Sequence, residues 1–586
     1  MNRIAATTYH ESIEPFAYAD GNDLVVRLRI GKNIALKVDV IHFDKFAQKE
    51  TIKTSEAALF SRDGSAHVMF QARLSRDTKR FKYFFRIEVA TGIVYFGREG
   101  ITPEEPVEWA TFEVPYLGER DRFNPPEWTK GARYYQIFPE RFNRSKDSSP
   151  RDDLVNWDDV PTPFSFFGGD LPGILEKLDH LTTLGINVLY MTPVFEAPSN
   201  HKYDTVDYLK VDPSFGSEQD LKNLVQACHD RGIRVVLDAV FNHMGYHNRV
   251  FQDLIQNGEQ SPYKDWIYPK SWPLSQEERN YETFGYVANM PKWRTATPEV
   301  EDYLCKVGEY WIEKVGIDGW RLDVSDEVEH RFWKHFRDRV KSVDADALIC
   351  GEIWQIATPW LRGDEFDAVM NYPLGRAILD WIAKDEIDAK DFDYSIERIR
   401  SLYPEPVLHT LWNLLDSHDT PRLLTICGGD IRRVKLASFL QFMFVGSPLI
   451  YYGDEVGMTG GNDPLCRGGM IWDEDKQNKD LLQHYQTLAA LRKDHPVLEK
   501  GDLRPLLQNR YTNLYAFMRF MPQDPEQVAV CLVNNGSRQI RIQLIDSNLP
   551  QGTYQLAYGQ GSTLIATGDF VTIKPRSALL LTKKGD

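Results

Sequence analysis

Apolar and polar positions alternate in short runs from Tyr18 to Val114. The runs are separated by Gly, Asp, Asn and Ser, and they include LVVRLRI, ALKVDVI, HVMFQARL and KYFFRIEV. Alternation with a period of two at such short spacing is typical of strands that bury one face. The pattern therefore predicts an N-terminal β-sandwich over residues 1–122, and the paired prolines of DRFNPPEWTKGARYY mark its end.

The pattern changes from residue 123 onward, where apolar runs alternate with amphipathic segments such as SEQDLKNLVQACHDRG and VEDYLCKVGEYWIEKVG. Parallel strands need helical crossovers, so eight strand and helix units predict a central (β/α)8 TIM barrel over 123–503. Short alternating runs then return, and they predict a C-terminal β-sandwich over 504–586. The eight expected strands are YYQIFPERF, INVLYMTPV, RVVLDAVFNH, DGWRLDV, ALICGEIW, FDAVMNY, LHTLWNLLDSHD and SPLIYYGDE.

Composition and charge narrow the class of protein. A formal net charge of −16 argues against nucleic acid or an anionic membrane as a partner, because both select basic surfaces. Residues 1–8 lack the features of a secretory signal, and the most apolar stretch, from Ser438, is too short and interrupted to span a membrane. Six scattered cysteines show no metal-ligand spacing. We expect a soluble, cytoplasmic, multidomain protein with reduced thiols.

Charged side chains inside GWRLDVSDE indicate a functional site, because burying a charge costs free energy unless the charge is paired or has a catalytic or binding role. In a barrel the catalytic groups stand at the carboxyl ends of strands, where Asp323, Glu352 and Asp419 are expected. Cleaving a glycosidic bond needs a proton donor and a carboxylate facing an oxocarbenium-like carbon. A single strand-end Asp is equally well a helix cap. Three acids with His243, His418 and Arg321 at matching strand ends are hard to explain in that way.

Four segments, in order along the chain, resemble the signature regions of the α-amylase family of retaining glycoside hydrolases. They are DAVFNH (238–243), GWRLDVSDE (319–327), GEIW (351–354) and LLDSHD (414–419). HKYDTVDYLKVDPSFG and YYGDEVGMTGGNDPLCR also match. The N-terminal sandwich resembles that of the neopullulanase, cyclomaltodextrinase and maltogenic amylase subfamily, so the resemblance covers essentially the whole chain.

The resemblance implies roles for the acids. Asp323 would be the nucleophile that forms a covalent glycosyl intermediate, and Glu352 the general acid that later acts as base. Asp419 would bond the 2- and 3-hydroxyls of the sugar. We expect Arg321 to keep Asp323 ionised, since an opposite charge nearby lowers the pKa of a carboxyl group.

The resemblance also implies substrate contacts. His243 and His418 would bond hydroxyls of the same sugar, and Tyr203 would stack on it with His201 alongside. Trp354 would line the leaving-group side. The contacts farther along the non-reducing side would come from Asp463 and Arg467.

Glu327 falls where the subfamily carries a glutamate linked to transglycosylation. The subfamily pattern V-A-N-E reads VSDE here. An extra acid on the acceptor side could reorient the incoming water or sugar. Alternatively, Asp326 and Glu327 simply begin the next helix, where acids suit the helix dipole.

The resemblance leaves room for a structural Ca²⁺, although the chemistry requires no cofactor. Gly168, Gly169 and Asp170 keep the GGD turn of many relatives. Asn143, Asp147 and Asp170 offer oxygen ligands, but Arg144 and Lys146 bring positive charge into the same loop. No metal ligands are assigned.

These observations favour an α-glucan hydrolase that cleaves α-1,4 links of cyclodextrins, maltooligosaccharides and pullulan, with some glycosyl transfer. Its partners would be neutral oligosaccharides and a second copy of the chain, because the subfamily's N-terminal sandwich covers the active site of a partner subunit. Two alternatives are a glucosidase for α-1,6 or α-1,1 links, and a catalytically silent carbohydrate-binding relative. The three acids argue against the second alternative.

Overall fold

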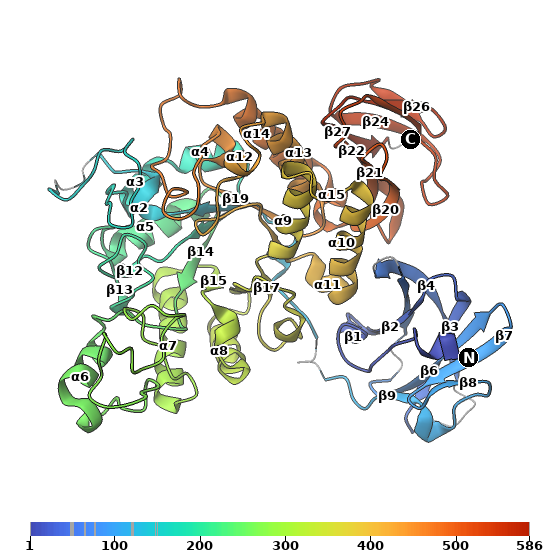
Figure 1. Ribbon diagram of the computed structural model, residues 1–586, viewed down its shortest axis with the longest axis horizontal. Coiled ribbons are helices and arrows are strands. Elements are labelled where there is room, and N and C mark those ends of the chain that lie inside the picture. Colours follow the sequence, from blue (N-terminus) through green and yellow to red (C-terminus); the bar gives the residue numbers. More distant parts are fainter. Residues whose placement is uncertain are drawn as a thin grey trace. The chain divides into compact units, whose positions relative to one another are not determined.

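The computed structural model describes residues 2–46, 52–63, 66–75, 78–118, 122–146, 148 and 151–584. The chain forms two compact units, coloured along the sequence in Figure 1. Unit 1 holds 1–124, 356–364 and 390–408, and unit 2 holds the remaining residues. Unit 1 therefore takes two segments from within the predicted barrel range. The predicted boundaries at 122 and 503 stay predictions.

The N-terminal segment forms a nine-stranded sheet in which β4 links two halves. Residues 53–57 of β4 pair with β3, and residues 58–63 pair with β5, with an irregularity between Leu59 and Ser61. The strand order is β1-β2-β5-β4-β3-β6-β7-β8, and β9 pairs with β6. The short helix α1 (Asn2–Ala5) comes first. The strands are β1 (Ala17–Asp20), β2 (Asp23–Gly31), β3 (Ala35–Asp44), β4 (Lys53–Asp63), β5 (His67–Leu74), β6 (Phe81–Val89), β7 (Gly92–Gly97), β8 (Gly100–Thr102) and β9 (Phe112–Val114).

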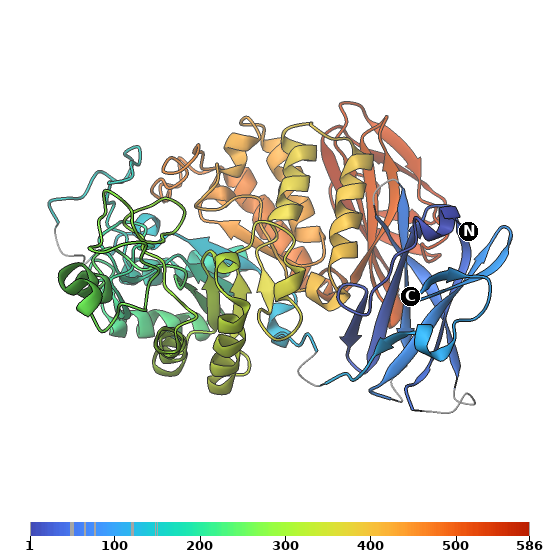
Figure 2. The same cartoon turned by 60° about the horizontal axis from the view of Figure 1, so that its bottom comes forward.

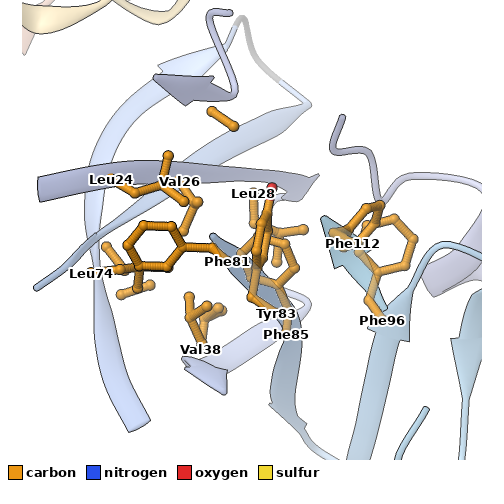
Figure 3. Close-up of a cluster of buried hydrophobic side chains, with 14 of the residues drawn as sticks. Leu24, Val26, Leu28, Val38, Leu74, Phe81, Tyr83, Phe85, Phe96 and Phe112 are labelled. Carbon is orange, nitrogen blue, oxygen red and sulfur yellow. The ribbon is translucent and has the colours of Figure 1, made fainter. Parts of the chain in front are cut away.

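Alternate residues of these strands make one apolar core. Leu24, Val26 and Leu28 of β2 lie in the same buried cluster as Phe81 and Phe85 of β6 (Figure 3). This is the arrangement that the period-two pattern predicts, since every second side chain points to the same face.

Two helices that follow the sixth barrel strand belong to unit 1, namely α10 (Ala389–Leu402) and α11 (Glu405–Leu408). Arg27 of β2 is fully buried and donates to the backbone oxygen of Tyr403 at 2.6 Å. Gln71 of β5 donates to Glu405 at 2.8 Å. Polar side chains thus join the sheet to a segment more than 330 residues away in sequence.

The barrel prediction is confirmed. Eight parallel strands follow the order β17-β16-β15-β14-β11-β10-β19-β18, and a parallel bridge between Met370 and Trp412 closes the ring. Each strand lies within one of the eight predicted runs. The strands are β10 (Tyr134–Ile137), β11 (Val188–Met191), β14 (Arg234–Ala239), β15 (Gly319–Leu322), β16 (Leu348–Gly351), β17 (Ala368–Val369), β18 (Trp412–Asn413) and β19 (Ser447–Tyr451).

Helices and one small hairpin lie between the barrel strands in the chain. The helix α7 (Pro298–Val315) follows β14, and α8 (His330–Val343) follows β15. These two helices lie side by side (Figures 1 and 2). The hairpin is β12 (Phe195–Glu196) with β13 (Asp207–Val211). The helices of unit 2 are α2 (Pro139–Phe142), α3 (Leu171–Glu176), α4 (Leu178–Leu184), α5 (Glu218–His229), α6 (Arg249–Asn257), α7 (Pro298–Val315), α8 (His330–Val343), α9 (Tyr372–Ile378), α12 (Leu423–Ile426), α13 (Ile431–Met443), α14 (Lys479–Asp494) and α15 (Pro496–Lys500).

Register inside the barrel places charges beside one another. Val236, Leu348 and Cys350 belong to the buried apolar cluster of the barrel. Arg321 of β15 is paired in register with Asp238 of β14, one strand away. Since parallel neighbours at one register position share a face, this pairing brings an arginine and a carboxylate together in the barrel.

The C-terminal region is a sheet domain. Six strands follow the order β20-β21-β22-β27-β24-β25, and β23 pairs separately with β26. Alternate residues such as Ala516, Met518 and Val530 form its buried core. The strands are β20 (Asp502–Asn509), β21 (Leu514–Met521), β22 (Asp524–Asn534), β23 (Ile540–Gln543), β24 (Thr553–Tyr558), β25 (Leu564–Ala566), β26 (Phe570–Ile573) and β27 (Ser577–Lys583).

Candidate active site

A cavity of about 410 Å³ opens in unit 2, in the loops at the carboxyl ends of the barrel strands. Asp323 directly follows β15 and Glu352 directly follows β16, while His243 and Asp419 follow β14 and β18. The lining residues are His201, Tyr203, His243, Phe284, Met290, Asp323, Val324, Asp326, Glu352, Trp354, His418, Asp419, Asp463 and Arg467.

Arg321 joins three carboxylates from beneath the cavity. It is fully buried, and its Nη1 donates to Asp323 Oδ1 at 2.9 Å and to both Asp238 oxygens at 3.1 Å. Its Nη2 lies 2.8 Å from Glu352 Oε1 as an ion pair, without the alignment of a hydrogen bond. One guanidinium therefore links the predicted nucleophile to the predicted acid. Arg321 is not among the residues that line the cavity, and its expected place among the sugar contacts stays a prediction.

Arg321 lowers the pKa of Asp323, as expected, but the net shift of that pKa is upward. Burial raises the pKa of Asp323 well above its usual range, and the neighbouring Glu352 raises it further. Arg321 opposes both effects but does not overcome them. Burial raises the pKa of Asp238 as well, to about 6. Burial thus acts against ionisation of Asp323 and Asp238, and the shared guanidinium of Arg321 acts in its favour.

Glu352 is held by the backbone and by two neighbouring side chains. Its Oε2 accepts the Val324 N–H at 3.0 Å, and its Oε1 accepts Trp354 Nε1 at 3.2 Å. Its backbone oxygen accepts Ser325 Oγ at 2.8 Å. A Cβ added at Gly351 would lie 2.9 Å from Ser325 Oγ and 2.5 Å from the Phe366 ring, so glycine is needed for this approach. The predicted acid is therefore fixed in orientation.

A chain of hydrogen bonds fixes His418. Gln136 donates to its Nδ1 at 2.7 Å, so the neutral ring carries its proton on Nε2, which lies 2.7 Å from the Tyr203 hydroxyl. Tyr203 in turn donates to Asp238 at 2.9 Å. The Tyr203 and His418 rings are parallel, 5.4 Å apart and 2° from coplanar orientation. Tyr203 thus connects the cavity wall to the carboxylate that pairs with Arg321.

His243 is buried at the cavity wall with an open nitrogen. Its Nε2 has no hydrogen-bond partner in the part of the chain that the structure describes. Burial lowers its pKa to about 3, as it does for His201, so both rings are neutral. Buried polar atoms are normally paired, and an exception in a cavity indicates that a ligand supplies the partner.

Arg467 organises the far side of the cavity. Its guanidinium lies 3.1 Å from Asp419 and 3.0 Å from Asp463, and its Nε donates to the His418 backbone oxygen at 2.8 Å. His418 Nε2 is 3.2 Å from the other Asp419 oxygen. Burial raises the pKa of Asp419, while Arg467 opposes that shift. These residues were predicted from separate motifs, and the structure brings them together.

Ten of the twelve predicted site residues line the cavity, and Arg321 and Glu327 do not. The side chain of Glu327 is 48% exposed and lies 3.6 Å from Lys292 Nζ. Sequence reasoning missed Phe284, Met290, Val324 and Asp326 as lining residues, and Asp238 beneath them. Asp238 stands inside the DAVFNH motif, and an acid within an apolar strand was the signal that could have revealed it. The loop that carries Phe284 and Met290 offers no such pattern.

The GGD loop is the part of the chain where a structural Ca²⁺ was expected. Asp170 caps α3 by accepting the Gly173 N–H at 2.6 Å, and it also accepts the Ser145 N–H and hydroxyl. The Asn143 amide donates to the Gly173 backbone oxygen, and Arg144 donates to the backbone of the same loop. Both Asp170 oxygens therefore already have protein donors, and Arg144 brings a positive charge into the loop, so this arrangement does not fit a Ca²⁺ shell. Asp147, named with them, lies outside the described residues. Across the described residues, no group of three or more His, Cys, Asp or Glu could hold a metal ion.

Comparison with known families gives two matches. The family described as the α-amylase catalytic domain matches residues 136–501, and the family described as the α-amylase N-terminal Ig-like domain matches 1–118. In the described residues, no helix has the length and apolar character needed to cross a membrane.

Relatives similar along most of their length carry three related names. Neopullulanase 2 of Thermoactinomyces vulgaris is 45% identical over 91% of each chain. An intracellular maltogenic amylase of Bacillus subtilis is 38% identical over 98% of this chain and 99% of its own. A solved cyclomaltodextrinase structure superposes with a TM-score of 0.92 at 38% identity, covering 99% of this chain and 100% of that one.

Proposed function

Because this chain belongs to the α-amylase family of glycoside hydrolases, we propose that it cleaves α-1,4-glucosidic bonds of cyclodextrins, maltooligosaccharides and pullulan with retention of configuration. The observation that carries the proposal is the set of Asp323, Glu352 and Asp419 around one cavity, with Arg321 joining the first two. The names of the relatives support the substrate class.

In the first step Asp323 attacks the anomeric carbon while Glu352 gives its proton to the departing glycosidic oxygen. The attack needs Asp323 ionised and Glu352 protonated. The step therefore requires the proton to be on Glu352, and not on Asp323, when the substrate is bound. The ion pair with Arg321 favours the ionised form of Asp323, and the Asp323–carbon bond that forms then removes the negative charge.

In the second step Glu352, now a carboxylate, removes a proton from the incoming water or sugar hydroxyl. The oxygen of that acceptor bonds to the anomeric carbon as the bond to Asp323 breaks, which restores both acids. Asp419 and the open Nε2 of His243 would hold sugar hydroxyls through both steps. A neutral sugar suits a cavity whose histidines are neutral.

We also infer the setting of the reaction. The relative named intracellular maltogenic amylase supports a cytoplasmic location. A homodimer would let the N-terminal sandwich of one subunit narrow the cleft of the other, favouring small or cyclic substrates. Sedimentation of the full chain tests the dimer, and a monomer at micromolar concentration would remove this part of the proposal.

The proposal as a whole is tested by following the products. Proton NMR of maltotriose hydrolysis should show the α-anomer first, since two displacements retain configuration. First appearance of the β-anomer would reject the double displacement. Parallel digests of β-cyclodextrin, pullulan and substrates with only α-1,6 or α-1,1 links would show whether α-1,4 bonds are the ones cleaved.

A further inference from the structure

A second cavity, of about 370 Å³, lies in unit 2 and, among the described residues, shares no lining residue with the active-site cavity. Two tryptophans line it, Trp157 from the loop between α2 and α3 and Trp472 from the loop between β19 and α14. Its volume is in the range in which proteins bind small molecules. We propose that the second cavity is an additional binding site for maltooligosaccharides, a ligand class that rests on the proposed function.

The two tryptophans offer carbon surface to a ligand, because the backbone already uses their polar atoms. Trp157 Nε1 donates to the Met470 backbone oxygen at 2.9 Å, and Trp472 Nε1 donates to the Phe142 backbone oxygen at 2.6 Å. Both side chains are half-buried, so each ring is held in place while part of it stays at the cavity wall. An apolar aromatic surface of this kind suits the C–H faces of a glucose ring, as in other ligand sites with few polar groups.

Gly469 lets the loop that carries Trp472 approach Trp157. A Cβ added at Gly469 would lie 2.5 Å from the Trp157 backbone oxygen and 3.0 Å from its Nε1, so a larger residue would push the two segments apart. Each ring is also packed edge-on against a phenylalanine, Trp157 against Phe167 at 6.2 Å and Trp472 against Phe142 at 5.0 Å. The tertiary structure therefore builds this pair of aromatic side chains from segments that are distant in sequence.

The charges on the wall of the second cavity balance. Among the described residues of that wall, Asp158 and Asp473 are acidic, and Arg144 and Lys476 are basic. A wall with equal numbers of positive and negative groups concentrates neither anions nor cations, because attraction of a charged ligand needs a surface of one sign. The charge pattern therefore favours a ligand that is polar and neutral, and an oligosaccharide is both.

The same charged groups can bond sugar hydroxyls. Lys476 Nζ lies 2.7 Å from Asp158 Oδ2 and 3.9 Å from Asp473 Oδ2, and the Lys476 and Asp158 side chains are 54% and 76% exposed. An exposed ion pair contributes little to stability, so these groups can turn toward a ligand at low cost. The ammonium group would donate to sugar hydroxyls and the carboxylates would accept from them, and such charge-assisted hydrogen bonds are stronger than neutral ones.

One loop contributes to both cavities. Arg467 lines the active-site cavity, and Met470 lines the second cavity. Three residues of fully extended chain span at most about 11 Å, so the two walls are close together. Arg141 holds this stretch of loop: its Nη1 donates to the Arg467 backbone oxygen at 3.1 Å, and its backbone oxygen accepts the Met470 N–H at 2.8 Å. A glucan bound in the second cavity would therefore stay near the catalytic acids, which raises its local concentration there.

The test measures maltotriose binding to the full chain by calorimetry, in a Glu352→Gln background that does not consume the ligand. At least two maltotriose molecules should bind per chain. Adding Trp157→Ala should weaken one of these binding events about tenfold, because one aromatic contact is lost, and should leave the other unchanged. Adding Lys476→Ala should weaken the same event about fivefold, because one hydrogen bond is lost. The Lys476 side chain is exposed, so this second variant keeps the test decisive if Trp157→Ala does not fold.

Trp128→Ala is the matched control. Trp128 is another half-buried tryptophan of unit 2 whose Nε1 donates to a backbone oxygen, that of Asp346 at 2.9 Å, and it is not among the described residues that line either cavity. It should leave every binding event unchanged. A single event in the Glu352→Gln chain would overturn the proposal, as would events that Trp157→Ala and Lys476→Ala do not alter, or that Trp128→Ala weakens equally. A chain without these substitutions that consumes no maltotriose would instead overturn the proposed function.

Discussion

Two histidines, one in each compact unit, are both buried but differ in their hydrogen bonding. His10 in the N-terminal sandwich and His243 in the barrel are both neutral, because burial lowers each pKa to about 3. His10 Nδ1 donates to the Arg27 backbone oxygen at 2.7 Å, and its Nε2 accepts from the Tyr83 hydroxyl at 2.9 Å. His243 Nε2 faces the cavity with no partner among the described residues.

The difference separates a side chain that completes the fold from one that awaits a ligand. His10 is also surrounded edge-on by the rings of Phe85 and Phe112, so its environment is complete without any other molecule. A satisfied buried polar group contributes to stability, and an unsatisfied one costs stability until a partner arrives. Removing the first should therefore destabilise the fold, and removing the second should weaken binding.

The largest effect should come from the group that moves protons in the same cavity as His243. Glu352→Gln keeps shape and removes the acid, so kcat on maltooligosaccharides should fall by about 10³-fold, within the range for lost general acid–base catalysis. Substrate binding should remain measurable by calorimetry.

The control is Glu455→Gln, another buried glutamate of unit 2, which bonds Tyr135 and His180 and does not line the cavity. Its kcat should stay within a few fold of wild type. Equal losses in the two variants would mean that Glu352 acts only through folding.

The second largest effect is expected from replacing His243, the histidine whose Nε2 has no partner among the described residues. His243→Asn should lower kcat/KM about tenfold, because a bound sugar loses one hydrogen bond to a buried group. Its melting temperature should stay close to wild type, since Nε2 gives up no partner among the residues that the structure describes. A large fall in melting temperature with unchanged kcat/KM would place His243 with the fold and erase the contrast with His10.

Replacing His10, both of whose ring nitrogens are hydrogen-bonded, should have the opposite effects on stability and activity. His10→Asn removes the histidine from the Arg27 carbonyl and from the Tyr83 hydroxyl, which keeps only Ser12 Oγ at 3.1 Å, so unfolding of the sandwich should become easier by about 2 kcal/mol. Hydrogen exchange in peptides of β2 and β6 reports this locally. The kcat of a dilute, folded sample on maltotriose should not change, and a loss of kcat with unaltered exchange would contradict the assignment.

The strands of the barrel could be predicted from the sequence because apolar patterns are local. All eight barrel strands were predicted, including β17 and β18 with two residues each, since their flanking runs FDAVMNY and LHTLWNLLDSHD are apolar enough to identify. Alternation does not specify which strands pair. It could not show that β4 links two halves of the N-terminal sheet, or that α10 belongs to the same compact unit as β2.

Site residues could be predicted where a polar side chain interrupts or directly follows an apolar strand. They could not be predicted where the path of a turn or loop determines which side chain reaches the cavity. Asp323, Glu352 and His243 follow apolar strands and were found. Whether Asp326 or Glu327 lines the cavity depends on the geometry of the 3₁₀ turn that carries both residues, and the position of Phe284 depends on the path of a loop. Neither could be predicted from the sequence pattern. The pKa of Asp323 rises because burial outweighs the charge of Arg321. The arginine was visible in the sequence, but the extent of burial was not.

The smallest effect is the one that the two histidines should share. A histidine whose folded pKa lies near 3 and whose unfolded pKa is near 6.5 stabilises the fold above pH 6.5, and this contribution is lost as pH falls toward 3. Between pH 6 and 4 the unfolded chain binds the extra proton. Each such histidine therefore adds a slope of up to about 1.4 kcal/mol per pH unit to the free energy of unfolding.

Both His10→Asn and His243→Asn should flatten that slope by up to one proton, although only one of them changes binding. Hydrogen exchange at pH 6, 5 and 4, corrected for the intrinsic rate, measures the slope for β2 peptides in the first variant and β14 peptides in the second. The equality is expected because titration follows burial, which the two rings share, whereas function follows the unpaired nitrogen, which they do not. A slope that survives in His243→Asn alone would show that this ring takes up its proton within the folded cavity, and the contrast between the two sites would then include charge.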